Sequence, residues 1–317
     1  MSNMLTLVVE GLESSPLGIE GEGLTVIPCP PGDLDRAFRK ALDSSEPEWI
    51  GTLRATQLSS EFAQGLLSLV RNSSGQGIVV PLQPAPGMPD LWAKLPPALA
   101  HLVPGRHAVT ALLMHVGLKP SSRQNDGDPW QSGDWKVEAL VGAPQGILHS
   151  ADLPPLVPRA PRTPKSWPQA VEEMVVPWAK ANLTPHRRTA LLAGFWLLQD
   201  ELDRSHSHSQ QIEGADGHFG DYWHAIMHRR EPDYGNSQYW FRRVGRHPVQ
   251  TVLAEQLIAG RFDPVPASWR GKLARGGWDS LAFVDLCEAA ESSPELDLFA
   301  RRIQWCEMLH LLCETVR

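Results

Sequence analysis

The chain has 317 residues, of which 42% are hydrophobic and 21% charged, the composition of an ordinary globular protein with one or two domains. Its formal net charge of −7 argues against a protein that coats nucleic acid or an acidic membrane, so any anion-binding site must be local. The sequence has neither a run of about 18 apolar residues nor the basic and apolar segments of a secretory signal, so we expect a cytoplasmic protein that does not cross a membrane.

The first 150 residues combine strand-like and helix-like patterns. Aliphatic runs predict strands over residues 5–9, 24–28, 77–82, 107–116 and 135–142. Helical spacing of apolar residues predicts helices over 33–42 and 60–70. The last two strands flank a polar segment with turn chemistry, 120–133, and we expect them to form an antiparallel hairpin. Residues 1–150 are therefore predicted to form an α+β domain.

A proline-rich segment, residues 151–168, follows the α+β part. It contains six prolines, which fix φ and remove backbone donors, so it is neither a helix nor a central strand. We interpret it as a linker between two domains or as a strap across the surface.

Residues 169–317 show helical spacing with short connections, which is typical of a mainly α-helical, bundle-like domain. Pro177 falls inside the first predicted helix, 169–182, and is expected to kink or split it. Thr184 and Pro185 form a start signal for the next helix, because proline is favoured at the first helical position. Further helices are predicted over residues 221–231, 236–244, 249–260, 279–292 and 294–317.

Histidines are concentrated in this helical part, with six of the twelve between positions 206 and 247. His224 and His228 are four residues apart, so both lie on one face of a helix and can share one metal ion. Asp203 and His206, three apart on the preceding helix, form a second pair. If the two helices pack together, these four residues predict a site for Zn²⁺, Fe²⁺ or Mn²⁺. The alternative is that the histidines near 206 belong to a solvated helix end.

Two further residues are candidates for acid–base work at this site. Glu231 follows His228 by three residues, and is either an additional metal ligand or a general base. His247 is a second candidate for proton transfer. The residue after His224 is not the glutamate of an HExxH motif, which excludes that class of metalloprotease.

Arginines cluster in the same stretch and give residues 221–247 a local charge of +2. Guanidinium groups grip carboxylates and phosphates, so the cluster predicts a pocket for a small anionic substrate, with Asn236 as a further contact. The alternative is that individual arginines form structural ion pairs. The candidate substrate-binding arginines are Arg229, Arg230, Arg242 and Arg243.

The motifs that the sequence lacks narrow the possible functions. It contains no P-loop, no dinucleotide-binding GxGxxG after a strand and no GxSxG elbow. The four cysteines form no CxxC pair and are expected to be buried, reduced thiols. Our first hypothesis is a metal-dependent enzyme of open reaction class. The alternatives are a metal-free module that binds phosphate, a nucleotide or RNA, and a scaffold without catalysis.

Overall fold

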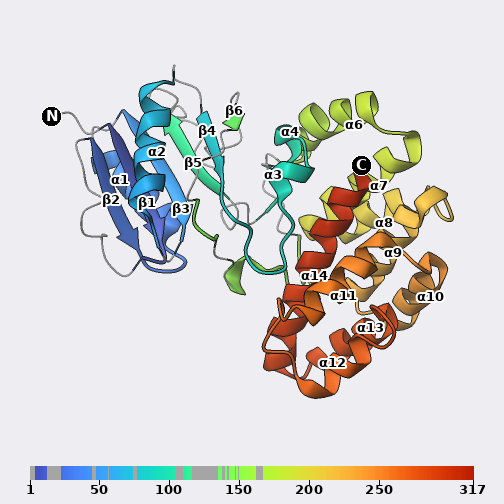
Figure 1. The fold of residues 1–317 in the computed structure, drawn as a ribbon. Coiled ribbons are helices and arrows are strands. Elements are labelled where there is room, and N and C mark those ends of the chain that lie inside the picture. Colours follow the sequence, from blue (N-terminus) through green and yellow to red (C-terminus); the bar gives the residue numbers. More distant parts are fainter. Residues whose placement is uncertain are drawn as a thin grey trace. The chain divides into compact units, whose positions relative to one another are not determined.

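The computed structural model divides the chain into two compact units (Figure 1). Unit 1 comprises Met1–Ala85 and Ala100–Asp152, and unit 2 comprises Pro86–Leu99 and Leu153–Arg317. The structure describes residues 4–12, 23–44, 48–55, 57–73, 77–100, 102–104, 110–115, 135–137, 140, 143–146, 148, 150–161 and 167–317.

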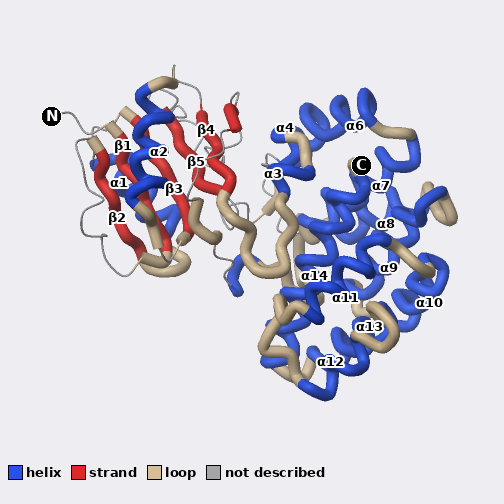
Figure 2. The backbone as a smooth tube through the Cα atoms, in the orientation of Figure 1, coloured by secondary structure: helices blue, strands red, loops and turns tan. Residues whose placement is uncertain are grey.

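Unit 1 is built on a mixed sheet of six strands in the order β2-β1-β3-β5-β4-β6 (Figure 2). The strands are β1 (Leu5–Glu10), β2 (Leu24–Cys29), β3 (Trp49–Arg54), β4 (Gly77–Pro81), β5 (Thr110–His115) and β6 (Trp135–Val137). β1 pairs in parallel with β2 and β3, and β4 pairs in parallel with β6. β5 is antiparallel to both of its neighbours, β3 and β4. All six residues of β1 are buried, as expected for a parallel strand covered on both faces.

Helices α1 (Leu34–Ser44) and α2 (Ser60–Arg71) accompany this sheet. The Ser59 hydroxyl caps α2 by accepting a hydrogen bond from the Phe62 backbone N–H at 3.1 Å. Phe62, Leu66 and Val70 then follow at helical spacing and pack into the core formed by the strands.

The predicted hairpin is wrong. Strand β4 lies between β5 and β6, and β6 runs parallel to β4 rather than antiparallel to β5. The polar segment 120–133 has turn-forming residues but is long enough for a crossover connection, so its composition does not decide which strand pairs with β6. That segment itself lies outside the described residues.

Unit 2 is helical, so the predicted order of an α+β part followed by a bundle-like helical part is confirmed. Its helices are α3 (Leu91–Lys94), α4 (Pro97–Ala100), α5 (Trp167–Ala170), α6 (Val176–Asn182), α7 (Pro185–Leu198), α8 (Leu202–Gln210), α9 (Phe219–Arg230), α10 (Tyr234–Val244), α11 (Pro248–Ile258), α12 (Ala267–Leu273), α13 (Ser280–Ala290) and α14 (Pro294–Thr315). α14 is buried almost all round from Phe299 onward, so it forms the centre of this unit. The inserted segment Pro86–Leu99 packs here as well, since His310 of α14 lies 3.3 Å from the carbonyl oxygen of Gly87.

The disturbance expected at Pro177 takes the form of a change in helix type. A single π-helical turn, Val171–Val175, joins α5 to α6, and Pro177 is the second residue of α6. Proline has no N–H and its ring crowds the carbonyl four residues earlier, so the wider turn before it accommodates the ring without ending the helix.

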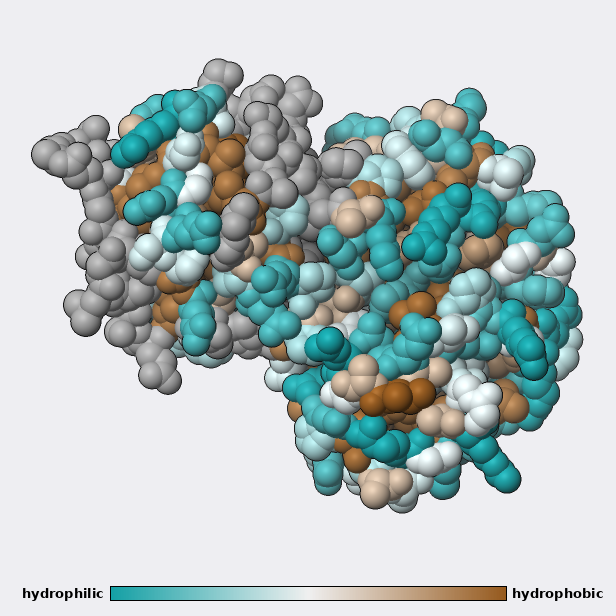
Figure 3. Space-filling view, in the orientation of Figure 1, coloured by the Kyte–Doolittle hydropathy of each residue, from teal (hydrophilic) through white to brown (hydrophobic). Residues whose placement is uncertain are grey.

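The helices, the surface of unit 2 and the cysteines can be compared with what the amino-acid composition predicts. Among the described residues, no helix combines the length and the apolar character needed to cross a membrane. The face of unit 2 seen in Figure 3 is mainly hydrophilic, with hydrophobic residues in small patches. All four cysteines are free and buried, as predicted.

Candidate metal centre

Helices α8 and α9 pack closely because of the backbone that joins them. α8 starts just after Asp200, which has a positive φ of 64° and ends α7. α9 starts after the left-handed residues Gly217 and His218. Gly220, in the first turn of α9, lies against Ile212, and a Cβ at this position would be 2.6 Å from the isoleucine side chain. The absence of a side chain at position 220 thus allows the start of α9 to lie against the loop that follows α8.

The structure brings three histidines together between α8 and α9. One ring nitrogen from each of His206, His224 and His228 lies within 4.8 Å of the others. The ring of His206 is edge-on to the other two, with centroid distances of 4.8 Å to His224 and 5.3 Å to His228. His224 and His228, four residues apart on α9, stack at 4.8 Å. We refer to these three residues as the histidine cluster.

His224 is the most deeply buried member of the cluster, with 1% of its surface exposed. The indole of Trp240, from α10, stacks on the His224 imidazole, with 4.0 Å between the ring centroids and 22° between the ring planes. Neither of its ring nitrogens has a hydrogen-bond partner within the part of the chain that the structure describes. Burial, followed by the charges of His228, His206 and Arg243, lowers the pKa of His224 to about 3. Its imidazole is therefore neutral, with a lone pair available to a metal ion.

His228 is oriented by residues at the end of α9 and on α10. Its Nδ1–H donates a hydrogen bond to the Glu231 carboxylate at 3.1 Å, so in the neutral ring Nε2 carries no proton. The Asn236 amide nitrogen lies 3.1 Å from Nε2 and 3.4 Å from Nδ1 of this ring, so it contacts the nitrogen that a metal ion would bind and has to shift when an ion binds there. Burial lowers the pKa of His228, against the opposing effect of Glu231. A histidine held by a carboxylate on one nitrogen is typical of metal ligands.

Asp203 does not join the cluster. It is exposed in the first turn of α8, where an acidic residue interacts favourably with the helix dipole, and it is not among the residues that converge on His224. The predicted ligand set of four is therefore reduced to three histidines within the described residues. His206, which is half-buried, is the only predicted ligand that α8 contributes.

The cluster fits a divalent ion after a small contraction. Tetrahedral bonds of about 2.0–2.1 Å place ligand nitrogens roughly 3.4 Å apart, so nitrogens that lie within 4.8 Å of one another must approach by at most about 1.4 Å. Rotation of exposed or half-buried side chains such as His206 supplies such a movement at little cost. Three neutral nitrogen ligands suit Zn²⁺ and other transition metals better than Mg²⁺ or Ca²⁺, which prefer oxygen.

The predicted substrate-binding role is wrong for two of the four arginines, because both are buried in ion pairs. Arg229 lies 2.5 Å from Glu307 of α14, and its guanidinium lies over the Phe283 ring. Arg230 lies 2.5 Å from Asp200 and donates to the Leu197 carbonyl oxygen at 2.7 Å. Both side chains are fully buried, so neither is accessible to a substrate, and the structural ion-pair alternative holds for both.

The other two arginines are exposed at the end of α10. Arg242 donates to the side chain of Gln238, one turn earlier on the same helix, at 3.2 Å. Arg243 lies with its guanidinium carbon 4.7 Å from the centre of the Trp240 ring. Of the arginines predicted to bind substrate, Arg243 is thus the one in contact with a wall of the histidine cluster.

His247 has a structural position outside the histidine cluster. Its Nδ1 atom accepts a hydrogen bond from the Val249 backbone N–H at 3.3 Å and caps α11. Its ring packs against Phe219 and Tyr222, and burial lowers its pKa to about 4. We therefore withdraw it as a catalytic acid or base, since a buried capping imidazole is not placed to exchange protons with a substrate.

One pair in this region has no counterpart in the sequence analysis. His218, at the start of α9, lies 2.9 Å from the buried carboxylate of Asp221, which also accepts a hydrogen bond from the Gly214 backbone. This pair fixes the loop that connects α8 to α9. The three-residue spacing between His218 and Asp221 is the sequence signal for this pair, but the four-residue spacing of His224 and His228 dominates the pattern around it.

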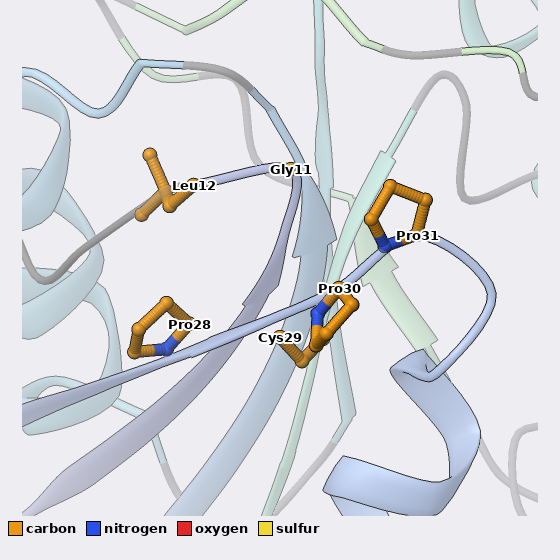
Figure 4. A pocket seen from close by; sticks show the side chains of 6 residues that line it. All are labelled: Gly11, Leu12, Pro28, Cys29, Pro30 and Pro31. Atoms are coloured by element: carbon orange, nitrogen blue, oxygen red, sulfur yellow. The ribbon is translucent and has the colours of Figure 1, made fainter.

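Unit 1 contains a cavity of about 440 Å³ where β1 and β2 end (Figure 4). It is lined by Gly11, Leu12, Pro28, Cys29, Pro30 and Pro31. Of these six residues only Cys29 carries a reactive group. Burial, followed by the charges of Glu10 and Asp33, raises the pKa of its thiol to about 11, so the thiol is protonated at neutral pH and is not a nucleophile.

Comparisons of the chain with protein-family models, with curated proteins and with solved structures found no match. The assignment of the site therefore rests on its side chains alone. Three imidazoles that converge on one point, one of them with orphaned nitrogens, form the strongest chemical constellation among the described residues.

Proposed function

We propose that the protein is a metal-dependent enzyme that acts on a small anionic substrate, and that the histidine cluster holds its divalent transition-metal ion. The observation that carries the proposal is the convergence of one nitrogen from each of His206, His224 and His228 within 4.8 Å. The buried, unpartnered nitrogens of His224 add to it, because a buried polar atom without a partner costs free energy that a bound ion would offset.

The number and charge of the ligands favour catalysis over a purely structural role. Three neutral imidazoles leave the full charge of a divalent ion uncompensated, and structural zinc sites usually have four protein ligands. When bound, such an ion supplies Lewis acidity at an open coordination position. The partial exposure of His206 lets small molecules approach from the α8 side.

Residues around the cluster have supporting roles in this proposal. Glu231 acts as a positioning residue, because its bond to Nδ1 of His228 fixes the tautomer in which Nε2 carries no proton. This role replaces the predicted one of general base. Trp240 covers His224 and excludes water from that side of the cluster. The burial of Arg229 and Arg230 removes two of the charges on which a nucleic-acid-binding module would depend.

The metal content of the protein, purified without chelator, tests the proposal. The matched pair of variants is His206→Ala and His208→Ala, two histidines on the same helix of which only the first belongs to the cluster. We expect about one zinc, iron or manganese ion per chain in the wild type and in His208→Ala, and a loss of tenfold or more in metal affinity in His206→Ala. Equal metal affinity in the two variants, or a wild type that binds none of these ions when they are added, would overturn the proposal.

A further inference from the structure

Helix α10 contacts the histidine cluster through two residues that lie one turn apart. Asn236 and Trp240 are separated by four positions, so both lie on the same face of α10. Trp240 stacks on His224, and Asn236 contacts His228, the next ring along α9. Of these two side chains only Asn236 carries a group that can bind a metal ion, because the indole nitrogen is a donor only.

The distance between Asn236 and His228 is close to the distance between two ligands of one ion. The amide nitrogen of Asn236 lies 3.1 Å from Nε2 of His228. Two atoms bound to the same tetrahedral ion are roughly 3.4 Å apart, because each lies about 2.0–2.2 Å from it. The end of the Asn236 side chain therefore has about the separation from Nε2 that a second ligand needs.

The charge of an ion decides which end of the Asn236 amide faces it. The amide nitrogen donates to the lone pair of Nε2, but its N–H groups would direct their positive ends toward a cation bound to that nitrogen. A half-turn about the Cβ–Cγ bond exchanges the nitrogen for the oxygen, which has nearly the same size. The reversed amide places its oxygen toward the cation, and asparagine oxygens bind divalent cations in other proteins.

The backbone that carries Asn236 is held against α9, so this change involves the side chain alone. The Asp233 carboxylate caps α10 by accepting a hydrogen bond from the Asn236 backbone N–H at 3.1 Å. The next residue, Ser237, is buried and donates to the carbonyl oxygen of Ala225 on α9 at 2.8 Å. A ligand on a fixed backbone loses little conformational entropy when it binds an ion.

We propose that Asn236 is the fourth protein ligand of the metal centre and binds the ion through its amide oxygen, beside one nitrogen from each residue of the histidine cluster. This inference rests on the proposed function, because it requires an ion in the cluster. It gives Asn236 a different role from the substrate contact expected from the sequence. The amide oxygen is uncharged, so the ion keeps its full charge and its Lewis acidity. It is also a weaker donor than an imidazole, so it is the ligand that a charged oxygen of a substrate would replace.

Metal affinities of two matched pairs of variants test the proposal. The first pair is Asn236→Ala and Gln238→Ala, and the second is Asn236→Asp and Gln238→Glu. Gln238 is the control because its side chain, on the same helix, donates to Asp285 on α13 instead. Competition with a chelator measures the affinity of each protein for Zn²⁺, and for Fe²⁺ and Mn²⁺ in separate titrations.

We expect Asn236→Ala to bind the ion about tenfold more weakly than the wild type, and Gln238→Ala to bind it normally. We expect Asn236→Asp to bind it more tightly than both the wild type and Gln238→Glu, because a carboxylate of the same shape adds a charged oxygen to the ligand set. Gln238→Glu adds the same charge to α10 away from the cluster, and so measures the effect of charge alone. A side chain that only supported the fold would not gain affinity from this change.

The outcomes separate the two proposals. An affinity in Asn236→Ala equal to or higher than that of the wild type, or an Asn236→Asp that binds no more tightly than Gln238→Glu, overturns the role of Asn236 and leaves the metal site standing. A wild type that binds none of the three ions overturns both proposals.

Discussion

The carboxylate of Glu231 lies 3.1 Å from the Nδ1 atom of His228, three residues earlier in the chain. Because Glu231 follows the last residue of α9, its side chain turns back along the helix toward the imidazole. This contact decides which nitrogen of His228 carries the proton, and so which nitrogen is available to a metal ion.

Replacing this carboxylate should weaken metal binding without unfolding the protein. We expect Glu231→Gln to bind zinc about tenfold more weakly than the wild type, at the low end of the effect of such partners, because the amide is a poorer acceptor for the Nδ1 proton. Competition with a coloured chelator measures the affinity. Glu288→Gln, an exposed acid on α13, is the control and should bind zinc normally. An unchanged affinity in Glu231→Gln would show that the contact does not orient His228.

Arg229 should prove essential for stability. Glu307 accepts hydrogen bonds from Arg229 at 2.5 Å and from the Tyr222 hydroxyl at 3.0 Å, and all three side chains are fully buried. Arg229→Met leaves this carboxylate without its counter-charge, so we expect a loss of about 3–5 kcal/mol in the free energy of unfolding, measured with urea. Arg242→Met, on the surface, should change it by less than about 0.5 kcal/mol. A small loss in Arg229→Met would contradict the structural role of this pair.

Gly194 should tolerate no side chain. It lies in α7 against the indole of Trp223 on α9, and a Cβ added there would be 2.6 Å from a ring atom. We expect Gly194→Ala to lower the free energy of unfolding by about 1–3 kcal/mol, because the rigid ring has to move. The control is Gly271→Ala in α12, where a Cβ meets nothing within 4 Å. That variant should be neutral or more stable by up to about 1 kcal/mol, since alanine favours the helix.

His247 should make the stability of unit 2 depend on pH. Burial lowers its pKa from 6.5 to about 4 in the folded protein. Between these two values the unfolded chain takes up a proton that the folded chain does not, so the free energy of unfolding should fall as the pH falls from 6.5 to 4. The contribution of this residue is roughly 3 kcal/mol.

The variant His247→Asn isolates this effect. Asparagine still offers an oxygen to the Val249 backbone N–H, so the cap on α11 is kept, but it has no proton to gain. Urea unfolding at pH 7, 6, 5 and 4 should show a flatter pH dependence for the variant than for the wild type. Parallel curves for the two proteins would show that His247 is not the group that titrates.

Local periodicity was enough to predict part of the site. The four-residue spacing of His224 and His228 places both on one face of α9 whatever the helix packs against, and His206 joins them because α8 is adjacent in sequence. The same approach failed for Asp203, since one residue near a helix start can face either solvent or a neighbour. The start of α8 at Leu202 decides this, and the apolar pattern did not show it.

The burial of the arginines and the order of the strands could not be predicted from local sequence patterns. A charged side chain carries no local sign of burial, and the partner of Arg229 is Glu307, 78 positions away on the central helix. The order of strands β5, β4 and β6 likewise depends on contacts between distant segments. Nothing in the composition of the connecting segments specifies these pairings.

All three members of the histidine cluster come from two consecutive helices, between positions 206 and 228. An ion that joins them would close only a short loop. Closing a short loop removes little conformational entropy from the unfolded chain, so the gain in the free energy of unfolding is small. Such an ion would stabilise the packing of α8 on α9 and would add little to the stability of the rest of unit 2. Stripping it should speed backbone hydrogen exchange in α8 and α9 while α14, at the centre of unit 2, remains protected.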